Sequence, residues 1–359
     1  VQDGGRFNCS KSTIKSSGQD IYGSKTVFYF RVGSSTGAGL RLNSTTLTDT
    51  NDEGIRVRYS TDVKITNSIL IDDSQDGIHL TNSKCVISNT TFKKHYYAIE
   101  LWYCNNVSVN DSIFDLNRYD IYCYYSQDIY VNRDTFRNTS NQANNVWYSQ
   151  RYRMEKCRTY YVNIGLYVYQ SLAYSTASNY SNGNNREIYV EYGSTVYSTG
   201  DRFYNSNMAF YANSGSTTYP SFLVAKNALI EKCYYGLYIS SQSIATCTNF
   251  TMKQCTYGVY GDTARSLQLL DSKVYKTVNC NVYSYSAFSM FFRNTTFMGT
   301  TSDHAIYNNN GNLLMQNCSV QNPDSSSYNA SSSFNTAFTR FINCTIAVNN
   351  IHCSDAAKT

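Results

Sequence analysis

The sequence is short of proline and of charge. It contains 2 prolines in 359 residues, and only 15% of its residues are charged. Proline cannot donate a ladder hydrogen bond, so its scarcity suits a chain whose backbone N–H groups mostly donate within β-sheets. The net charge of +5 is modest and no basic run is interleaved with aromatic residues, which argues against a nucleic-acid-binding protein.

Long apolar runs and clustered metal ligands are missing as well. No stretch approaches the about 18 apolar residues of a membrane span, and the chain does not start with a basic segment followed by an apolar one. We therefore expect no membrane span and no signal peptide in this sequence, as in a mature secreted chain. The 4 histidines are scattered and the 12 cysteines include no C-x-x-C, so we predict no metal site.

A short motif recurs in the first half of the chain. Two aliphatic positions are separated by one residue, and successive copies begin 23, 21 and 22 residues apart. The copies are Gly54–Val57, Gly77–Leu80, Ala98–Leu101 and Asp120–Cys123. A second alternating segment follows each copy, and after it come an Asn or Asp and then Leu70, Phe92, Phe114 or Phe136. We predict two short strands per repeat and no helix.

A repeat of this length predicts a solenoid. Side chains alternate between the faces of a strand, so Ile55 and Val57 share the apolar face while Arg56 and Arg58 point outward. One coil cannot bury that face alone, whereas coils stacked about 4.8 Å apart bury a continuous core and pair their strands in parallel. The motif and its spacing resemble the right-handed parallel β-helix family, which includes pectate-lyase-like proteins. The resemblance implies an all-β fold, a single-stranded right-handed parallel β-helix solenoid of roughly a dozen coils of about 22 residues.

The same pattern returns further along the chain. Aliphatic positions 22 to 24 residues apart follow Gly236 and Gly258, and Leu166, Ile188 and Ala209 mark coils between the two regular stretches. We expect one elongated domain, because a solenoid grows linearly and escapes the size limit of a globular core. Its predicted parts within 1–359 are an entry segment (1–30), regular coils (54–136), less regular coils with an inserted loop (137–225), regular coils (226–348) and a tail (349–359).

Two cysteine pairs fall at matching places in neighbouring coils. Cys233 and Cys255 are 22 residues apart, and Cys318 and Cys344 are 26 residues apart. Aligned positions on adjacent coils lie about 4.8 Å apart, within the Cα separation that a disulfide allows. Cross-coil disulfides would indicate an oxidising, extracellular compartment. The alternative is that cysteine fills small buried positions as a thiol.

Many asparagines lie in N-x-S/T sequons, which accept surface glycans in a secreted chain. The turn of each coil also favours Asn followed by a small polar residue, so the sequons have a structural explanation as well. The glycosylation candidates are Asn8, Asn43, Asn89, Asn106, Asn110, Asn138, Asn179, Asn249, Asn294, Asn317, Asn329 and Asn343.

Outward residues of successive coils form columns, and one column near the N-terminus carries charge. In the family that the chain resembles, the substrate groove lies on this outer face. Lyases there use acidic calcium ligands with an Arg base, and hydrolases use clustered Asp with a nearby His. If the chain is an enzyme, the resemblance therefore implies as candidates Asp72, Asp73, Asp76, His79, Glu100 and Arg56. Calcium is expected only for a lyase, and the alternative to catalysis is a cross-strand charge ladder.

A second outward column is aromatic and runs through much of the chain. Stacked rings at one coil position stabilise a sheet, so this column has a purely structural explanation. The functional alternative is a contact surface for a glycan or for another subunit, because tyrosine is enriched at interfaces. The candidate contact residues are Arg58, Trp102, Tyr122, Tyr124, Tyr167, Tyr189, Phe210, Tyr238, Tyr260, Tyr283 and Tyr307.

Two classes of function fit these patterns. The chain lacks the N-x-D, Gly-His-Gly and Arg-x-Lys series of polygalacturonase-like hydrolases, and no acids converge over three coils as in calcium-dependent lyases. This favours an extracellular structural or adhesive protein, a subunit of a filament, appendage or virion or cell-surface fibre. We expect such a subunit to self-associate end to end or side by side, to contact glycans and to need no cofactor. The alternative is a polysaccharide lyase or glycoside hydrolase, or an inactive glycan-binding relative, with its groove over the N-terminal coils.

Overall fold

The computed structural model describes residues 6–15, 28–31, 39–48, 54–72, 75–300, 304–309, 311–321, 331–335, 339–347 and 350–353. Contacts divide the chain into two compact units, residues 1–179 (unit 1) and 180–359 (unit 2). The described residues form strands, turns and bends. No helix long and apolar enough to span a membrane occurs among them. The expectation of one elongated domain stays a prediction.

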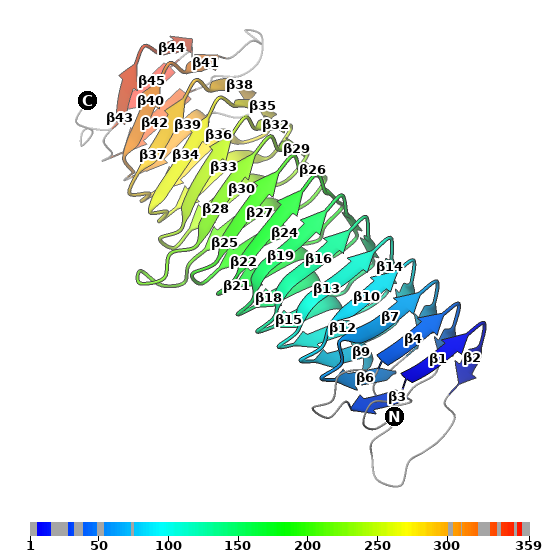
Figure 1. Ribbon diagram of the computed structural model, residues 1–359. Helices are drawn as coiled ribbons and strands as arrows, with labels where there is room; N and C mark the ends of the chain where they lie inside the picture. Colours follow the sequence, from blue (N-terminus) through cyan, green and yellow to red (C-terminus); the bar gives the residue numbers. More distant parts are fainter. Residues whose placement is uncertain are drawn as a thin grey trace. The chain divides into compact units, whose positions relative to one another are not determined.

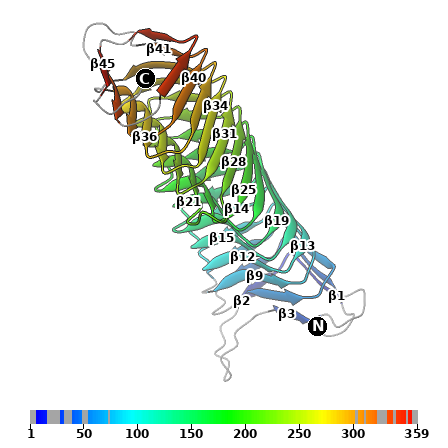
Figure 2. The ribbon, with the colours of Figure 1, turned by 90° about the vertical axis from the view of Figure 1, so that its left-hand side faces the viewer.

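Each coil contains three strands, and each strand pairs in parallel with its counterpart in the next coil (Figures 1 and 2). The predicted all-β parallel solenoid is therefore confirmed. The prediction of two strands per coil is wrong, because the Asn after the second strand turns a corner into a third strand. Phe92, for example, lies in the three-residue strand Thr91–Lys93. The three sheets of each unit are called A, B and C.

In unit 1, sheet A consists of β3 (Phe28–Arg31), β6 (Ile55–Arg58), β9 (Asp76–Thr81), β12 (Tyr97–Trp102), β15 (Tyr119–Tyr124), β18 (Gln142–Trp147) and β21 (Ile164–Tyr169). Sheet B consists of β1 (Arg6–Ser10), β4 (Gly39–Asn43), β7 (Asp62–Thr66), β10 (Cys85–Ser88), β13 (Asn105–Asn110), β16 (Gln127–Asn132), β19 (Gln150–Glu155) and β22 (Leu172–Thr176). Sheet C consists of β2 (Thr13–Lys15), β5 (Thr46–Thr48), β8 (Ile69–Ile71), β11 (Thr91–Lys93), β14 (Ile113–Asp115), β17 (Thr135–Arg137) and β20 (Arg158–Tyr160).

The strand β23 (Asn179–Ser181) lies at the boundary of the units. In unit 2, sheet A consists of β24 (Arg186–Glu191), β27 (Met208–Asn213), β30 (Tyr235–Ser240), β33 (Tyr257–Asp262), β36 (Cys280–Tyr285), β39 (His304–Asn309), β42 (Ser331–Asn335) and β45 (Asn350–Cys353). Sheet B consists of β25 (Thr195–Thr199), β28 (Phe222–Lys226), β31 (Ile244–Thr248), β34 (Ser266–Leu270), β37 (Met290–Arg293), β40 (Leu313–Gln316) and β43 (Thr339–Ile342). Sheet C consists of β26 (Arg202–Tyr204), β29 (Leu229–Glu231), β32 (Thr251–Lys253), β35 (Lys273–Thr277), β38 (Thr296–Thr300), β41 (Ser319–Gln321) and β44 (Thr345–Ala347).

The interior of unit 1 is a stack of matching layers. Ile99 in β12 pairs in register with Ile78 in β9, and both side chains are fully buried. On sheet C the rings of Phe92, Phe114 and Phe136 stack with 5.0 and 4.9 Å between successive centroids, and none is exposed. Fully burying one such ring stabilises the fold by about 2–3 kcal/mol. These layers hold the outward side chains of sheet A in fixed columns.

An asparagine in the left-handed conformation turns the chain from sheet B to sheet C. Asn67 and Asn89 have φ angles of 50° and 49°, in a region that Asn tolerates better than most residues. Their amides form a ladder between coils. Asn67 Nδ2 donates to Asn43 Oδ1 at 2.9 Å, and Asn89 Nδ2 donates to Asn67 Oδ1 at 2.7 Å. The residue after the asparagine is buried, and Ser68 Oγ accepts the N–H of Thr45 at 3.2 Å.

This corner explains part of the sequon density, because Asn89, Asn249, Asn294, Asn317 and Asn343 all occupy it with positive φ and a Thr or Ser begins the strand two residues later. Among the sequon asparagines, Asn110 is partly buried in β13, and Asn329 lies outside the described residues. The exposed ones are Asn8, Asn43, Asn89, Asn106, Asn138, Asn179, Asn249, Asn294, Asn317 and Asn343. Their glycosylation stays a prediction.

The described cysteines are free thiols. Cys233 and Cys255 are buried, and their sulfur atoms lie 3.6 and 3.8 Å from backbone carbonyl oxygens of their own coils. Cys318 is buried and its thiol is within hydrogen-bonding reach of Cys344 on the next coil. Cys233, Cys255 and Cys318 thus fill small buried positions as thiols, which is the alternative to disulfides. The two predicted disulfides stay predictions.

Candidate functional site

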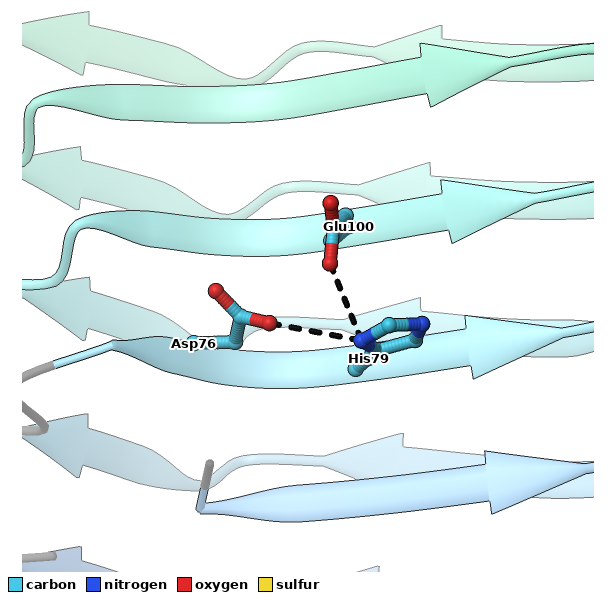
Figure 3. A group of neighbouring side chains, drawn as sticks. All are labelled: Asp76, His79 and Glu100. Carbon is cyan, nitrogen blue, oxygen red and sulfur yellow. Dashed lines mark ion pairs between the residues drawn. The ribbon is translucent and has the colours of Figure 1, made fainter. Parts of the chain in front are cut away.

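Three ionisable side chains meet on the outer face of sheet A in unit 1. Asp76 and His79 come from β9, and Glu100 comes from β12 (Figure 3). His79 Nδ1 lies 2.9 Å from Glu100 Oε2 and 3.4 Å from Asp76 Oδ2. The side chains point toward one another, and only 5–9% of each residue is exposed. We call this set the acid–histidine cluster.

A local irregularity at the start of the strands brings Asp76 beside His79. Residues three apart in a regular strand point to opposite faces. Here the register pairs Asp76 with Tyr97 and next Ile78 with Ile99, so that Gly77 is left out of the paired positions. Gly77 lies so close to the next coil that a Cβ there would be 2.7 Å from the carbonyl oxygen of Ala98. A glycine at this position therefore allows the close backbone approach that places both side chains outward.

The environment shifts the pKa values of the two carboxyl groups of the cluster in opposite directions. Burial, reinforced by the charge of Glu100, raises the pKa of Asp76 to about 7. Burial acts in the same direction on Glu100, but the hydrogen bond and charge of His79 outweigh it and hold the pKa of Glu100 below its ordinary value. Near neutral pH, Glu100 is therefore the carboxylate that faces His79, and Asp76 is the group that holds a proton.

Aromatic residues surround the acid–histidine cluster. The Trp102 ring stacks on the His79 ring with 6.2 Å between centroids. Tyr122 pairs in register with Glu100 on the next coil, and its ring lies 5.2 Å from that of Tyr97. These rings cover the cluster and leave it little contact with solvent.

The other predicted catalytic candidates stand outside the cluster. Arg56 in β6 pairs in register with His79, which places it in the same outward column. Asp72 is exposed on the turn after β8, where its carboxylate accepts a hydrogen bond from Lys94 at 3.2 Å. Asp73 lies outside the described residues. Any catalytic role of these residues stays a prediction.

A second feature of sheet A in unit 1 is an aromatic patch of seven rings. One column runs in register through Trp102, Tyr124, Trp147 and Tyr169 and contains both tryptophans of the chain. The adjoining turn carries Tyr103, Tyr125 and Tyr148. Together these seven residues are called the aromatic patch.

The turn tyrosines of the patch adopt an unfavourable backbone conformation. Tyr103, Tyr125 and Tyr148 have φ angles of 55°, 49° and 50°. For a bulky residue the left-handed region costs about 1–2 kcal/mol, which Asn or Gly would largely avoid. Their rings stack with centroids 5.5 and 4.9 Å apart, and Tyr103 and Tyr125 are nearly half exposed. Tyr59 and Tyr192 occupy the same turn position in other coils, so what distinguishes the three patch tyrosines is that they lie in consecutive coils and stack on one another.

Sequence analysis identified only part of this patch. Trp102 and Tyr124 were among the predicted contact residues, with Arg58 at the same position on an earlier coil. Four of the five missed residues belong to a repeated pair of adjacent aromatics, Trp102-Tyr103, Tyr124-Tyr125 and Trp147-Tyr148, which recurs at intervals of 22 and 23 residues, and the fifth, Tyr169, continues the column. This signal is visible in the sequence.

The predicted tyrosine column is a continuous ladder in unit 2. It runs in register through Tyr189, Tyr211, Tyr238, Tyr260, Tyr283 and Tyr307. Successive ring centroids are 4.7–5.0 Å apart. The predicted outward position of Phe210 is wrong, because Phe210 is fully buried and Tyr211 points outward in its place. A slip of one residue exchanges the two faces of a strand.

The angles between neighbouring rings differ between the Tyr283 end of the ladder in unit 2 and Tyr124 in the patch of unit 1. Tyr283 is nearly parallel to both neighbours, at 7° to Tyr260 and 16° to Tyr307, so both of its faces are covered. In the patch, Tyr124 is tilted by 47° to Trp102 and by 84° to Tyr125. The end of the ladder at Tyr283 therefore presents ring edges and hydroxyl groups, whereas the Tyr238–Tyr260 contact is tilted by 38°, and the patch combines tilted rings with stacked ones. In unit 1 the column is also interrupted, since Asn145 pairs with both Tyr122 and Tyr167, and Tyr167 is only 7% exposed.

Comparison with known proteins supports the architecture. A family described as "Right handed beta helix region" matches residues 3–114 and 30–144. No protein of curated function matches the sequence.

Several solved β-structures are similar at the level of the fold. A tailspike protein mutant of E. coli bacteriophage HK620, in complex with a pentasaccharide, is 10% identical over 92% of this chain and 70% of that chain, with a TM-score of 0.43. A mannuronic acid specific polysaccharide family 6 lyase from human gut microbiota is 11% identical over 78% and 82%, with a TM-score of 0.41. Tailspike protein 3 of bacteriophage CBA120 is 11% identical with a TM-score of 0.37, and this chain spans 57% of its length. At these identities and TM-scores the similarities carry no argument about function.

Proposed function

We propose that this chain, a right-handed parallel β-helix protein, binds a glycan through the aromatic patch of unit 1. The observation that carries the proposal is the concentration of the chain's 2 tryptophans in a single outward column, where Trp102, Tyr124 and Trp147 follow one another in register. Rigid amphipathic rings offer apolar faces to sugar C–H groups and polar edges to hydroxyl groups. Successive coils repeat such rings along the solenoid, which suits an extended chain of sugar units.

Conformational strain in the same place supports this proposal. Tyr103, Tyr125 and Tyr148 keep bulky rings at a left-handed turn position that smaller residues such as Asn82, Ser241 and Thr263 occupy in other coils. The tyrosines therefore reduce stability locally, and functional sites are where such strain is retained. None of the seven patch residues carries a charge that would pair with a uronate carboxylate, so we propose a neutral glycan in preference to a polyuronate.

The proposed biological setting is extracellular, with the protein acting as an adhesive or structural element of a surface or fibre. Scarce charge, exposed sequon asparagines at turns and the regular solenoid support this setting. Self-association of the chain belongs to the same proposal.

The test is binding of neutral and acidic oligosaccharides by isothermal titration calorimetry. Alanine at both Trp102 and Trp147 should weaken binding of the neutral ligand by roughly 10-fold or more, because two lost aromatic contacts of about 0.5–1.5 kcal/mol each exceed the about 1.4 kcal/mol that corresponds to tenfold. Tyr260→Ala in the ladder of unit 2 is the matched control and should bind as the wild type does. Equal loss of affinity in the control, or no neutral glycan bound by the wild type, would refute the proposal.

Glycan cleavage at the acid–histidine cluster is a second candidate function. A pair of carboxyl groups with separated pKa values is typical of acid–base catalysis, and Asp76 and Glu100 form such a pair. Their low exposure means that Tyr97 or Trp102 must move before a sugar reaches both groups. A screen of neutral glycans and polyuronates, with Glu100→Gln as the inactive control, tests this function. Hydrolysis or elimination that survives in Glu100→Gln would exclude the cluster as the active site.

A further inference from the structure

The acid–histidine cluster has the composition of a metal site, although sequence analysis predicted none. The four histidines are scattered in the sequence, but strand pairing brings His79 between two carboxylates from adjacent coils. We propose that Asp76, His79 and Glu100 bind one divalent transition-metal ion of the Zn²⁺ type. This proposal is independent of the glycan proposal, since metal binding needs no sugar and none of the turn tyrosines of the aromatic patch.

Distances between the potential ligand atoms fit a bound ion. Nitrogen and oxygen ligands lie about 2.0–2.1 Å from Zn²⁺, so two of them are roughly 2.9 Å apart at a right angle and roughly 3.4 Å apart at the tetrahedral angle. His79 Nδ1 lies 2.9 Å from Glu100 Oε2 and 3.4 Å from Asp76 Oδ2. One ligand atom from each residue falls within 4.8 Å of the others. Small side-chain rotations therefore suffice to place all three atoms on one ion.

Charge and burial favour a cation at this place. Asp76 and Glu100 are 5% and 8% exposed, so ionising both side chains in this poorly solvated environment would require a compensating cation. A divalent ion would compensate both charges, with the imidazole of His79 as a neutral ligand. The ligands also stand on two paired strands of a regular sheet, which fixes their backbone positions.

The ligand set selects the type of metal. One imidazole with two carboxylates suits Zn²⁺ and its transition-metal neighbours, whereas Ca²⁺ takes about 6–8 oxygen ligands. Three protein ligands leave a fourth position on a tetrahedral ion for water or for an oxygen of a bound molecule. Trp102 stacks on His79 at 6.2 Å, so its ring forms part of the wall around the ion.

The test uses the full chain after dialysis against a chelator, followed by titration with ZnCl₂ or CaCl₂ and quantification of bound metal by mass spectrometry. We expect one Zn²⁺ per chain and no stoichiometric Ca²⁺. His79→Ala and Glu100→Gln should each weaken Zn²⁺ binding by roughly 100-fold or more, because even residues behind a ligand typically contribute 10–100-fold. Asp111→Asn, an exposed carboxylate paired with Arg133, is the control and should retain the wild-type affinity.

A second readout reports the position of the ion. Co²⁺ or Cu²⁺ bound beside His79 should quench the fluorescence of Trp102, so quenching should persist in Trp147→Phe and disappear in Trp102→Phe. Circular dichroism spectra that match the wild type show that each variant is folded. Absence of stoichiometric Zn²⁺ in the wild type, or equal Zn²⁺ binding in His79→Ala, would overturn the metal site and leave the glycan proposal untouched.

Discussion

The buried carboxyl group of Asp120 should make unit 1 less stable as the pH rises. Asp120 has no exposed surface, and it accepts hydrogen bonds from Asn117 Nδ2 at 2.8 Å and from Thr139 Oγ1 at 2.6 Å. These donors favour the ionised form, but burial has the larger effect and raises the pKa of Asp120 from 3.8 to about 7. The folded chain therefore binds this proton more tightly than the unfolded chain does.

The size and sign of the effect follow from this pKa difference. A difference of about 3 units corresponds to about 4 kcal/mol of unfolding free energy. Below pH 3.8 the group is protonated in both states, and its contribution is fully present. Between pH 4 and about 7 the unfolded chain loses the proton first, so the free energy of unfolding falls as the pH rises.

Urea denaturation of the wild type and of Asp120→Asn at pH 4.5, 6 and 8 tests this reasoning. The amide cannot ionise, so the free energy of unfolding of Asp120→Asn should fall by about 3–4 kcal/mol less than that of the wild type between pH 4.5 and 8. Asp134 is also buried, with a pKa raised to about 8, and its contribution remains in both proteins. A difference between the two proteins that is the same at all three pH values would refute the reasoning.

Three further predictions concern packing, strain and thiols. Phe114→Ala should lower the free energy of unfolding by about 4 kcal/mol because the ring lies fully buried between two others, and a loss below 1 kcal/mol in urea would contradict the stacked core. Tyr59→Asn should raise the melting temperature and increase the free energy of unfolding by about 1 kcal/mol, because Tyr59 is 53% exposed at a φ of 61°. A destabilised variant would show that the Tyr59 ring packs against its neighbours. Cys318 and Cys344 should form a disulfide in air-oxidised protein. The bond would close a loop of 26 residues (344 − 318) and raise the free energy of unfolding by about 3 kcal/mol. Peptide mass mapping that finds both thiols alkylated would count against this disulfide.

The inward-facing positions of the sheet A strands were predictable from the sequence. The motif that contains Ile55, Ile78 and Ile99 marks strands of sheet A because aliphatic side chains must alternate with outward ones. Sheet C was missed because its strands, except β35 and β38, are three residues long, too short for an alternating pattern to show. The coil around β18 was missed because Asn144 takes the aliphatic position, where it is buried and Tyr152 donates a hydrogen bond to it.

The candidate site was predictable only in part. His79 and Glu100 follow from the spacing of the repeat, since both occupy the same position in adjacent coils. The approach of Asp76 depends on the irregularity at Gly77, which recurs at Ala98 and in later strands of sheet A but which a strict alternation of faces does not predict. Phe210 was placed outward because the coil between β24 and β30 was aligned on Ala209, one residue too early.

The central claim is that a glycan contacts the aromatic patch, and tryptophan fluorescence tests it most directly. Both tryptophans of the chain lie in the patch, so the signal has no other source. Titration with a neutral oligosaccharide should shift the tryptophan emission of the wild type and of the single variants Trp102→Phe and Trp147→Phe. In each protein, the affinity obtained from the emission should equal the affinity obtained by calorimetry. Binding detected by calorimetry that leaves the emission of all three proteins unchanged would place the glycan elsewhere and contradict the account.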